Sequence, residues 1–209
     1  ILSLLSRSVA RRMMSDVPLG VLLRGGLDSS LITTLMAEHT AAPVESFSIG
    51  FDEPSYDERA YSNHVAQALK TSHHLSICRM SSLVADAPSV LTRLDEAFCD
   101  ASILPTWMVC REARQHVTVA LTGDGGDELF AGYDPFAAIE PAKLARAALP
   151  LPLLGFLRGA AERLPRSGKN MSLDFKIRRA LSGIIHSQPL WTPVWMAPLT
   201  IEEINDFFG

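Results

Sequence analysis

The chain lacks the features that would tie it to a membrane, to a cysteine-held metal or to nucleic acid. Its three cysteines form no CxxC pair and show no zinc-ligand spacing, so we expect buried thiols in a reducing compartment, the cytoplasm. No apolar run reaches the roughly 18 residues that a membrane span needs, and no signal-peptide pattern opens the sequence. The formal net charge of −4 argues against a polyanionic partner. Because Ile1 lies inside an apolar-periodic helix, we expect a piece of a longer protein.

Short β-patterned runs alternate with helical patterns up to about residue 133. Runs 21–23, 44–50, 73–78 and 117–121 read as strands, and helical spacing begins at Ser29 and recurs over 57–70, 82–94 and 104–116. This alternation predicts an α/β fold, an open parallel sheet of about four or five strands with helices on both faces. Residues 134–209 are rich in Ala, Leu and Arg and read as a helical extension. We therefore divide the chain into a core, 1–133, and this extension.

Two loops rich in glycine and acid follow two of the predicted strands. "RGGLDSS" follows the first strand and "TGDGGDE" follows the fourth. In open parallel sheets, ligands bind at the carboxyl ends of the strands, where the strand order reverses. We therefore expect the two loops to face one ligand.

The first loop combines features that suit a phosphate group, although an ordinary tight turn would look similar. Gly25 and Gly26 allow backbone N–H groups to approach an anion, and a helix start follows, with Asp28 or Ser29 as its expected cap. The pattern is neither GxxxxGK[ST] nor GxGxxG. A carboxylate at Asp28 would repel phosphate by about 4 kcal/mol at 4 Å and a dielectric near 20 unless a cation lay between them. The sequence therefore suggests a site for Mg²⁺ and a polyphosphate.

Longer stretches carry a resemblance to a known family. "DVPLGVLLRGGLDSSLI", "SFSIGFDEPSYDE" and "LPTWMVCREARQHVTVALTGDGGDELFAGY" resemble the synthetase domain of glutamine-dependent asparagine synthetases, which are PP-loop ATP pyrophosphatases with a HUP-like fold. The likeness is dense from about Val9 to Tyr133. It implies that a carboxylate, aspartate in true asparagine synthetases, is activated by ATP as an acyl-adenylate, and that ammonia from a glutaminase domain then forms the amide. Related enzymes that build β-lactams or other amides look similar.

The resemblance also assigns roles to residues of both loops. It implies that the pyrophosphate is held by Gly25, Gly26, Ser29 and Ser30, and Mg²⁺ by Asp28 and Asp127. It places Leu23 and Ile49 against adenine or ribose, partly through backbone, and Thr122 and Gly123 in the nucleotide pocket. Asp28 and Asp124 are the candidate catalytic residues, and Asp124 stands where the family often carries Glu. A homodimer is a further expectation.

The chain departs from the family pattern in two respects. The family loop normally opens with Ser, whereas here it opens with Arg24, a nucleotide-binding candidate that could grip phosphate, fold outward or fill the pocket. Of these, we expect weakened or altered ATP binding. The amino-terminal glutaminase and a distal lysine-bearing loop find no match in these 209 residues. Three alternatives stay open: a related ligase with another substrate, a PP-loop enzyme that adenylates a nucleic-acid base, and a nucleotide-binding module without catalysis.

Other conspicuous residues have simpler interpretations. Adjacent side chains of a strand point to opposite faces, so His73 and His74 are not expected to share a metal ion. Trp191 and Trp195, four residues apart, are expected to pack in a helical core. The acidic segment "DEPSYDE", 52–58, reads as a surface loop, with folding over a nucleotide as the alternative.

Overall fold

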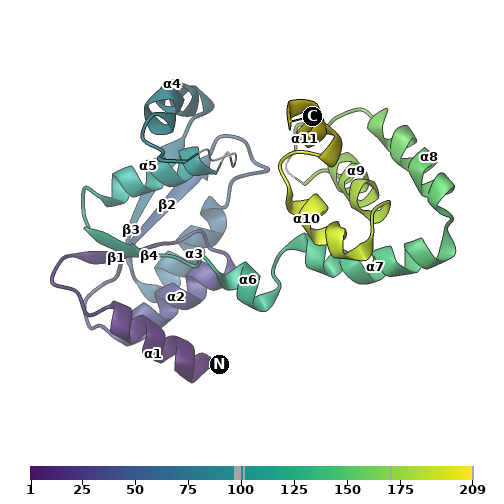
Figure 1. Cartoon of the computed structure of the whole chain (residues 1–209). Helices are drawn as coiled ribbons and strands as arrows, with labels where there is room; N and C mark the ends of the chain where they lie inside the picture. The colour runs from purple at the N-terminus through teal and green to yellow at the C-terminus, as the bar shows by residue number, and fades with distance from the viewer. Residues whose placement is uncertain (97–99, 101, 170, 209) are drawn as a thin grey trace. The chain divides into compact units, whose positions relative to one another are not determined.

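The computed structural model describes residues 1–96, 100, 102–169 and 171–208, and it consists of two compact units, 1–126 and 127–209 (Figure 1). The first unit is an α/β structure and the second is helical, which confirms the predicted fold class. The functional division after residue 133 stays a prediction. Within the described residues, no helix is both long and apolar enough to cross a membrane.

Four parallel strands form the centre of the first unit. In chain order its elements are α1 (Leu2–Arg12), β1 (Leu19–Leu22), α2 (Leu27–Glu38), β2 (Glu45–Phe51), α3 (Arg59–Leu69), β3 (Ser72–Cys78), α4 (Met80–Leu91), α5 (Ile103–Ala113) and β4 (Val119–Leu121). The strand order in space is β3-β2-β1-β4, with Val21 paired to Ser46 on one side and to Leu121 on the other. After β3 the chain therefore crosses to the opposite side of β1, and the point where the strand order reverses lies between β1 and β4.

Helices cover both faces of this sheet (Figure 1). On one face α1 and α2 pack over β1, and their core comprises Val9, Val21, Leu35, Met36 and Val44. On the other face α5 packs over β2, and its core comprises Phe47, Ala113 and Val117. Val21 and Phe47 are almost completely buried, because both faces of a parallel sheet are covered by helices.

Two local expectations are wrong. Helix α2 begins at Leu27 with Gly26 as its N-cap, so Asp28 and Ser29 lie inside the first turn and cap nothing. Gly26 takes the extended conformation that an N-cap needs, with φ −69° and ψ 168°. The helix therefore begins two residues earlier than we expected from the positions of Asp28 and Ser29. Of the three thiols, Cys78 is buried as expected, but Cys110 is exposed on α5. Cys99 lies outside the described residues.

The second unit is built around a pair of tryptophans. After the five-residue α6 (Gly126–Phe130), which starts at the last residue of the first unit, it contains α7 (Asp134–Ala148), α8 (Leu151–Glu162), α9 (Leu173–Ile184), η1 (Gln188–Leu190), α10 (Trp191–Met196) and α11 (Ile201–Phe208). Trp191 and Trp195 are buried with ring centroids 5.8 Å apart, and Leu154 and Ile184 join the same core. As predicted, these two tryptophans pack in a helical core.

The two adjacent histidines of β3 contact different faces of the sheet, as expected. His73 bonds through Nδ1 to the hydroxyl of Ser46 at 2.8 Å, whereas His74 bonds to Glu45 at 2.6 Å and stacks on Phe47. Among the described side chains, Nε2 of His73 is buried without a partner. Burial, and then the neighbouring His74, lower the pKa of His73 below its usual value of 6.5.

This environment makes His73 a source of acid sensitivity. Because its pKa is lower in the folded than in the unfolded chain, the neutral ring contributes stability above pH 6.5 that is lost as the pH falls below that value. We predict that His73→Gln reduces the loss of thermal stability between pH 7 and pH 5, measured by circular dichroism. His64→Gln, on the exposed side of α3, is the control and should leave that loss unchanged. An undiminished loss in His73→Gln would contradict the assignment.

Candidate functional site

The two glycine-rich loops meet at the carboxyl ends of β1 and β4, where the strand order reverses. A Cβ atom added to Gly123 would lie 2.7 Å from the backbone nitrogen of Ser29. One added to Gly126 would lie 2.4 Å from Cγ of Asp28 and within 2.7 Å of both carboxylate oxygens. At Gly123, only glycine allows the two backbones to approach this closely. The two loops therefore lie side by side, and a ligand that both of them face stays a prediction.

The first loop is held in its turn by its own backbone and by one hydroxyl. Gly25 has a φ of +87°, which favours glycine. The hydroxyl of Ser29 accepts the N–H of Arg24 at 3.2 Å and donates to the carbonyl of Gly26 at 3.4 Å. Ser29 is buried, and Arg24 is exposed. These contacts indicate that Ser29 shapes the loop, a role that the sequence did not distinguish from direct phosphate binding.

The start of α2 has the properties of an anion site. Its N-cap, Gly26, supplies no side-chain hydrogen bond to the first turn, and a Cβ there would meet nothing within 4 Å. Free N–H groups at the start of a helix carry partial positive charge and attract phosphate. Within the described part of the chain, the hydroxyl of Ser30 is buried without a hydrogen-bond partner. An open helix start beside an unsatisfied hydroxyl fits a phosphate group.

The candidate carboxylates have different surroundings. Asp28 is half-buried between the two loops, whereas Asp124 is exposed and is held by the Thr122 hydroxyl at 2.9 Å. Asp127 starts the second unit, where a Cβ added to Gly132 would lie 2.1 Å from Oδ1 of Asp127. The described residues contain no cluster of three or more His, Cys, Asp or Glu side chains that could hold a metal. Mg²⁺ is often bound by only one or two carboxylates together with substrate phosphates, and a cation shared by Asp28 and Asp127 stays a prediction.

Leu23, the residue after β1, is bonded to the middle of β2. The N–H of Leu23 donates to the carbonyl of Phe47 at 2.8 Å, and the carbonyl of Leu23 accepts the Ser48 hydroxyl. Leu23 is completely buried, whereas Ile49 is half-buried. Both backbone groups of Leu23 therefore serve the sheet, which leaves Ile49 as the more accessible of the two candidates for contact with a nucleoside.

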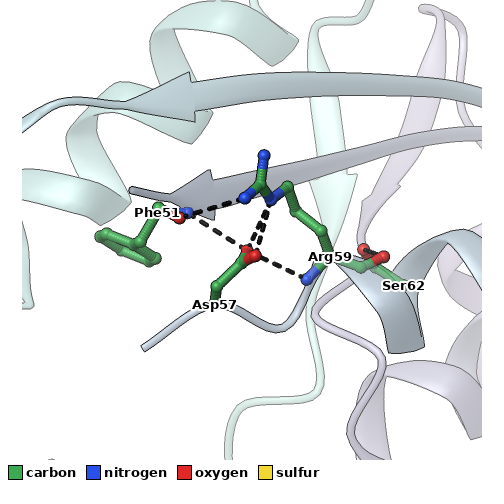
Figure 2. Close-up of polar contacts among 4 residues, drawn as sticks. All are labelled: Phe51, Asp57, Arg59 and Ser62. Carbon is green, nitrogen blue, oxygen red and sulfur yellow. Dashed lines mark hydrogen bonds and ion pairs between the residues drawn. The ribbon is translucent and has the colours of Figure 1, made fainter. Parts of the chain in front are cut away.

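Sequence reasoning missed an ion pair beside this edge of the sheet. Asp57, interpreted as part of an acidic surface loop, is turned inward and bonds to Arg59 and to the N–H of Phe51 (Figure 2). The acid two residues before an arginine at the start of a helix was a possible signal. Spacing alone does not distinguish such a pair from solvated charges.

Comparison with known proteins identifies a family for this chain. The asparagine synthase family model matches residues 1–192, most of the chain. The chain belongs to the asparagine synthase family. A relative from Mycobacterium tuberculosis strain H37Rv is 34% identical over 174 residues, which are 83% of this chain and 26% of the relative.

Other members of the asparagine synthase family give a similar result. Glutamine-hydrolyzing asparagine synthetase 1 of Bacillus subtilis strain 168 is 35% identical over 127 residues, 61% of this chain and 20% of the relative. Glutamine-hydrolyzing asparagine synthetase 1 of Arabidopsis thaliana is 35% identical over 139 residues, 60% of this chain and 23% of the relative. The chain therefore spans about a quarter or less of these relatives.

The contact between the two loops can be tested by adding a methyl group at a glycine where they meet. We predict that Gly123→Ala lowers the free energy of unfolding by about 1–3 kcal/mol, because the new methyl group would lie 2.7 Å from the backbone nitrogen of Ser29, which cannot rotate away. Urea denaturation followed by circular dichroism measures the change. Gly159→Ala, inside α8 where a Cβ meets nothing within 4 Å, is the control and should raise stability by about 0.5–1 kcal/mol. Equal stability of Gly123→Ala and the parent chain would show that the loops are not in contact.

Proposed function

We propose that this chain is the ATP-binding part of an amide-forming ligase of the asparagine synthetase type. The observation that carries the proposal is the approach of Gly123 and Gly126 to Asp28 and Ser29 at the switch point of the sheet. The names of the family and of the relatives support asparagine as the product. In this reaction the side-chain carboxylate of aspartate attacks the α-phosphorus of ATP, and pyrophosphate leaves. Ammonia then attacks the acyl carbon, which gives asparagine, AMP and a proton.

The residues at the loop contact suit the charges of this reaction. Backbone N–H groups of Gly25, Gly26 and the first turn of α2, with the Ser30 hydroxyl, would hold the pyrophosphate. Asp28 and Asp127 would hold Mg²⁺, which neutralises charge on the leaving pyrophosphate. The Thr122 hydroxyl donates to the Asp124 carboxylate, which would accept the proton lost by ammonia. Most of the catalytic effect would come from positioning and charge neutralisation.

A second candidate function is nucleotide binding without amide formation. Arg24 favours it, because an exposed arginine occupies the position where the family loop normally opens with a serine. A guanidinium on a long side chain must lose rotamer freedom to contact phosphate, unlike a hydroxyl fixed in the loop. The glutaminase domain, the distal lysine loop and a homodimer would belong to the whole protein and remain proposals.

Exchange of labelled pyrophosphate into ATP separates these functions. We expect exchange that depends on both aspartate and Mg²⁺, because adenylation of a carboxylate is reversible while pyrophosphate is present. The assay applies to this chain with Mg-ATP and each candidate acid. ATP binding without exchange would favour the nucleotide-binding module. Exchange with a different acid only would assign another substrate.

The role of Asp28 gives a prediction whose sign depends on the cation. Asp28→Asn should weaken binding of Mg-ATP about tenfold or more, because it removes a ligand of the ion. Without Mg²⁺, the same variant should bind ATP no more weakly than the parent chain, because the repulsion between the carboxylate and the phosphates is gone. Isothermal titration with Mg²⁺ or with EDTA measures both affinities.

Controls make this prediction specific. Asp16→Asn, an exposed acid before β1, should change neither affinity. Asp127→Asn should show the same dependence on Mg²⁺ as Asp28→Asn. A uniform loss of ATP affinity with and without Mg²⁺, or unfolding of the Asp28 variant, would contradict the assignment of this carboxylate to a cation.

A further inference from the structure

Asp57 and Arg59 tie the last residue of β2 to the first turn of α3 (Figure 2). The Asp57 carboxylate accepts the backbone N–H groups of Phe51 and Arg59, both at 3.3 Å. It also accepts Nε of Arg59 at 2.8 Å on one oxygen and 2.7 Å on the other. Nη2 of Arg59 donates to the carbonyl of Phe51 at 3.4 Å, so the guanidinium and the carboxylate together bind both backbone groups of Phe51.

This ion pair is more enclosed than an ordinary surface pair. The Asp57 side chain is 19% exposed and that of Arg59 is 37% exposed. Desolvation of the Asp57 carboxyl acts to raise its pKa, but the hydrogen bonds from Arg59 and Phe51 outweigh it and lower that pKa. The arginine side chain lies across Gly50, where an added Cβ would be 2.2 Å from its Cδ. Gly50 therefore provides the space in which the arginine lies.

The same turn of α3 also contacts the first glycine-rich loop, residues 24–30, which is called the phosphate loop below. Ser62 is buried, and its hydroxyl donates to the carbonyl of Arg59 at 3.3 Å. A Cβ added to Gly25 would lie 2.5 Å from the backbone nitrogen of Ser62 and 2.6 Å from the carbonyl carbon of Tyr61. The backbone of α3 therefore packs directly against Gly25, the residue of the loop with a φ of +87°.

We propose that Asp57 and Arg59 are positioning residues for the phosphate loop. They hold the first turn of α3 at the end of β2. This helical turn supports the left-handed conformation of Gly25. Neither side chain needs to contact the nucleotide. The role in ATP binding rests on the function proposed above, whereas the mechanical link to the loop does not.

Hydrogen exchange without nucleotide tests the link itself. Arg59→Met keeps much of the apolar stem and removes the hydrogen bonds, and Asp57→Asn removes the charge. Both should speed amide exchange in the segment 23–30 several-fold, measured by mass spectrometry. Gly50→Ala should do the same by displacing the arginine while leaving the pair's charges in place. Unchanged exchange in this segment in all three variants would overturn the proposal, whether or not ATP binds.

A matched ion pair on another part of the same unit provides the control. Nη1 of Arg111 on α5 lies 3.1 Å from Oδ2 of Asp86 on α4, with side-chain exposures of 47% and 33%. Asp86→Asn removes the same charge as Asp57→Asn but lies on α4, which packs on α5, the helix that covers the other face of the sheet (Figure 1). It should leave exchange in the segment 23–30 unchanged. Equal acceleration by Asp86→Asn would assign the effect to general destabilisation and overturn the proposal.

Nucleotide titration then tests the consequence for the site. Arg59→Met and Asp57→Asn should each raise the Kd for Mg-ATP about five- to tenfold, and Arg59→Lys should recover part of the loss. The double variant should be little weaker than either single variant, because both break one unit. Faster exchange with an unchanged Kd would overturn the positioning role. Failure of the parent chain to bind Mg-ATP would remove the proposed function, and the exchange result would still decide the link.

Discussion

The arrangement of this protein depends on the contact of two loops whose backbones are closer than side chains would allow. Gly123 approaches the backbone of Ser29, and Gly126 approaches the carboxylate of Asp28. The contact exists because β4 lies beside β1, so that two carboxyl ends distant in sequence become neighbours. A side chain at Gly123 would separate the loops, since the backbone atoms that face it cannot rotate away, whereas Gly126 faces the Asp28 carboxylate, which can.

The contact places an acid in surroundings that otherwise suit an anion. Asp28 lies in the first turn of α2, where N–H groups point outward and the buried Ser30 hydroxyl has no partner among the described residues. A phosphate would be attracted by the helix start and repelled by the acid. In the proposed function a cation resolves this conflict. In that proposal the same conflict would favour phosphate that carries a metal ion, because free phosphate would meet the uncompensated charge.

Hydrogen bonds behind the loops keep them in place. The Ser48 hydroxyl and the N–H of Leu23 join the end of β1 to the middle of β2, and Ser29 closes the first loop on itself. Asp57 and Arg59 add a further connection through α3. None of these groups needs to meet a ligand. They show how a site made of flexible glycines obtains a defined geometry from the strands and helices around it.

The sequence by itself determined the α/β class, the two loops and the family, because hydrophobic periodicity and glycine-rich motifs are local properties of the chain. It also determined that His73 and His74 would contact opposite faces, since alternation along a strand is fixed by backbone geometry. Only the tertiary structure decided that Gly26 rather than Ser29 caps α2, and that Asp57 turns inward to Arg59. A cap depends on where the backbone becomes helical, and an ion pair depends on which groups lose water together. Neither can be read from the spacing of residues.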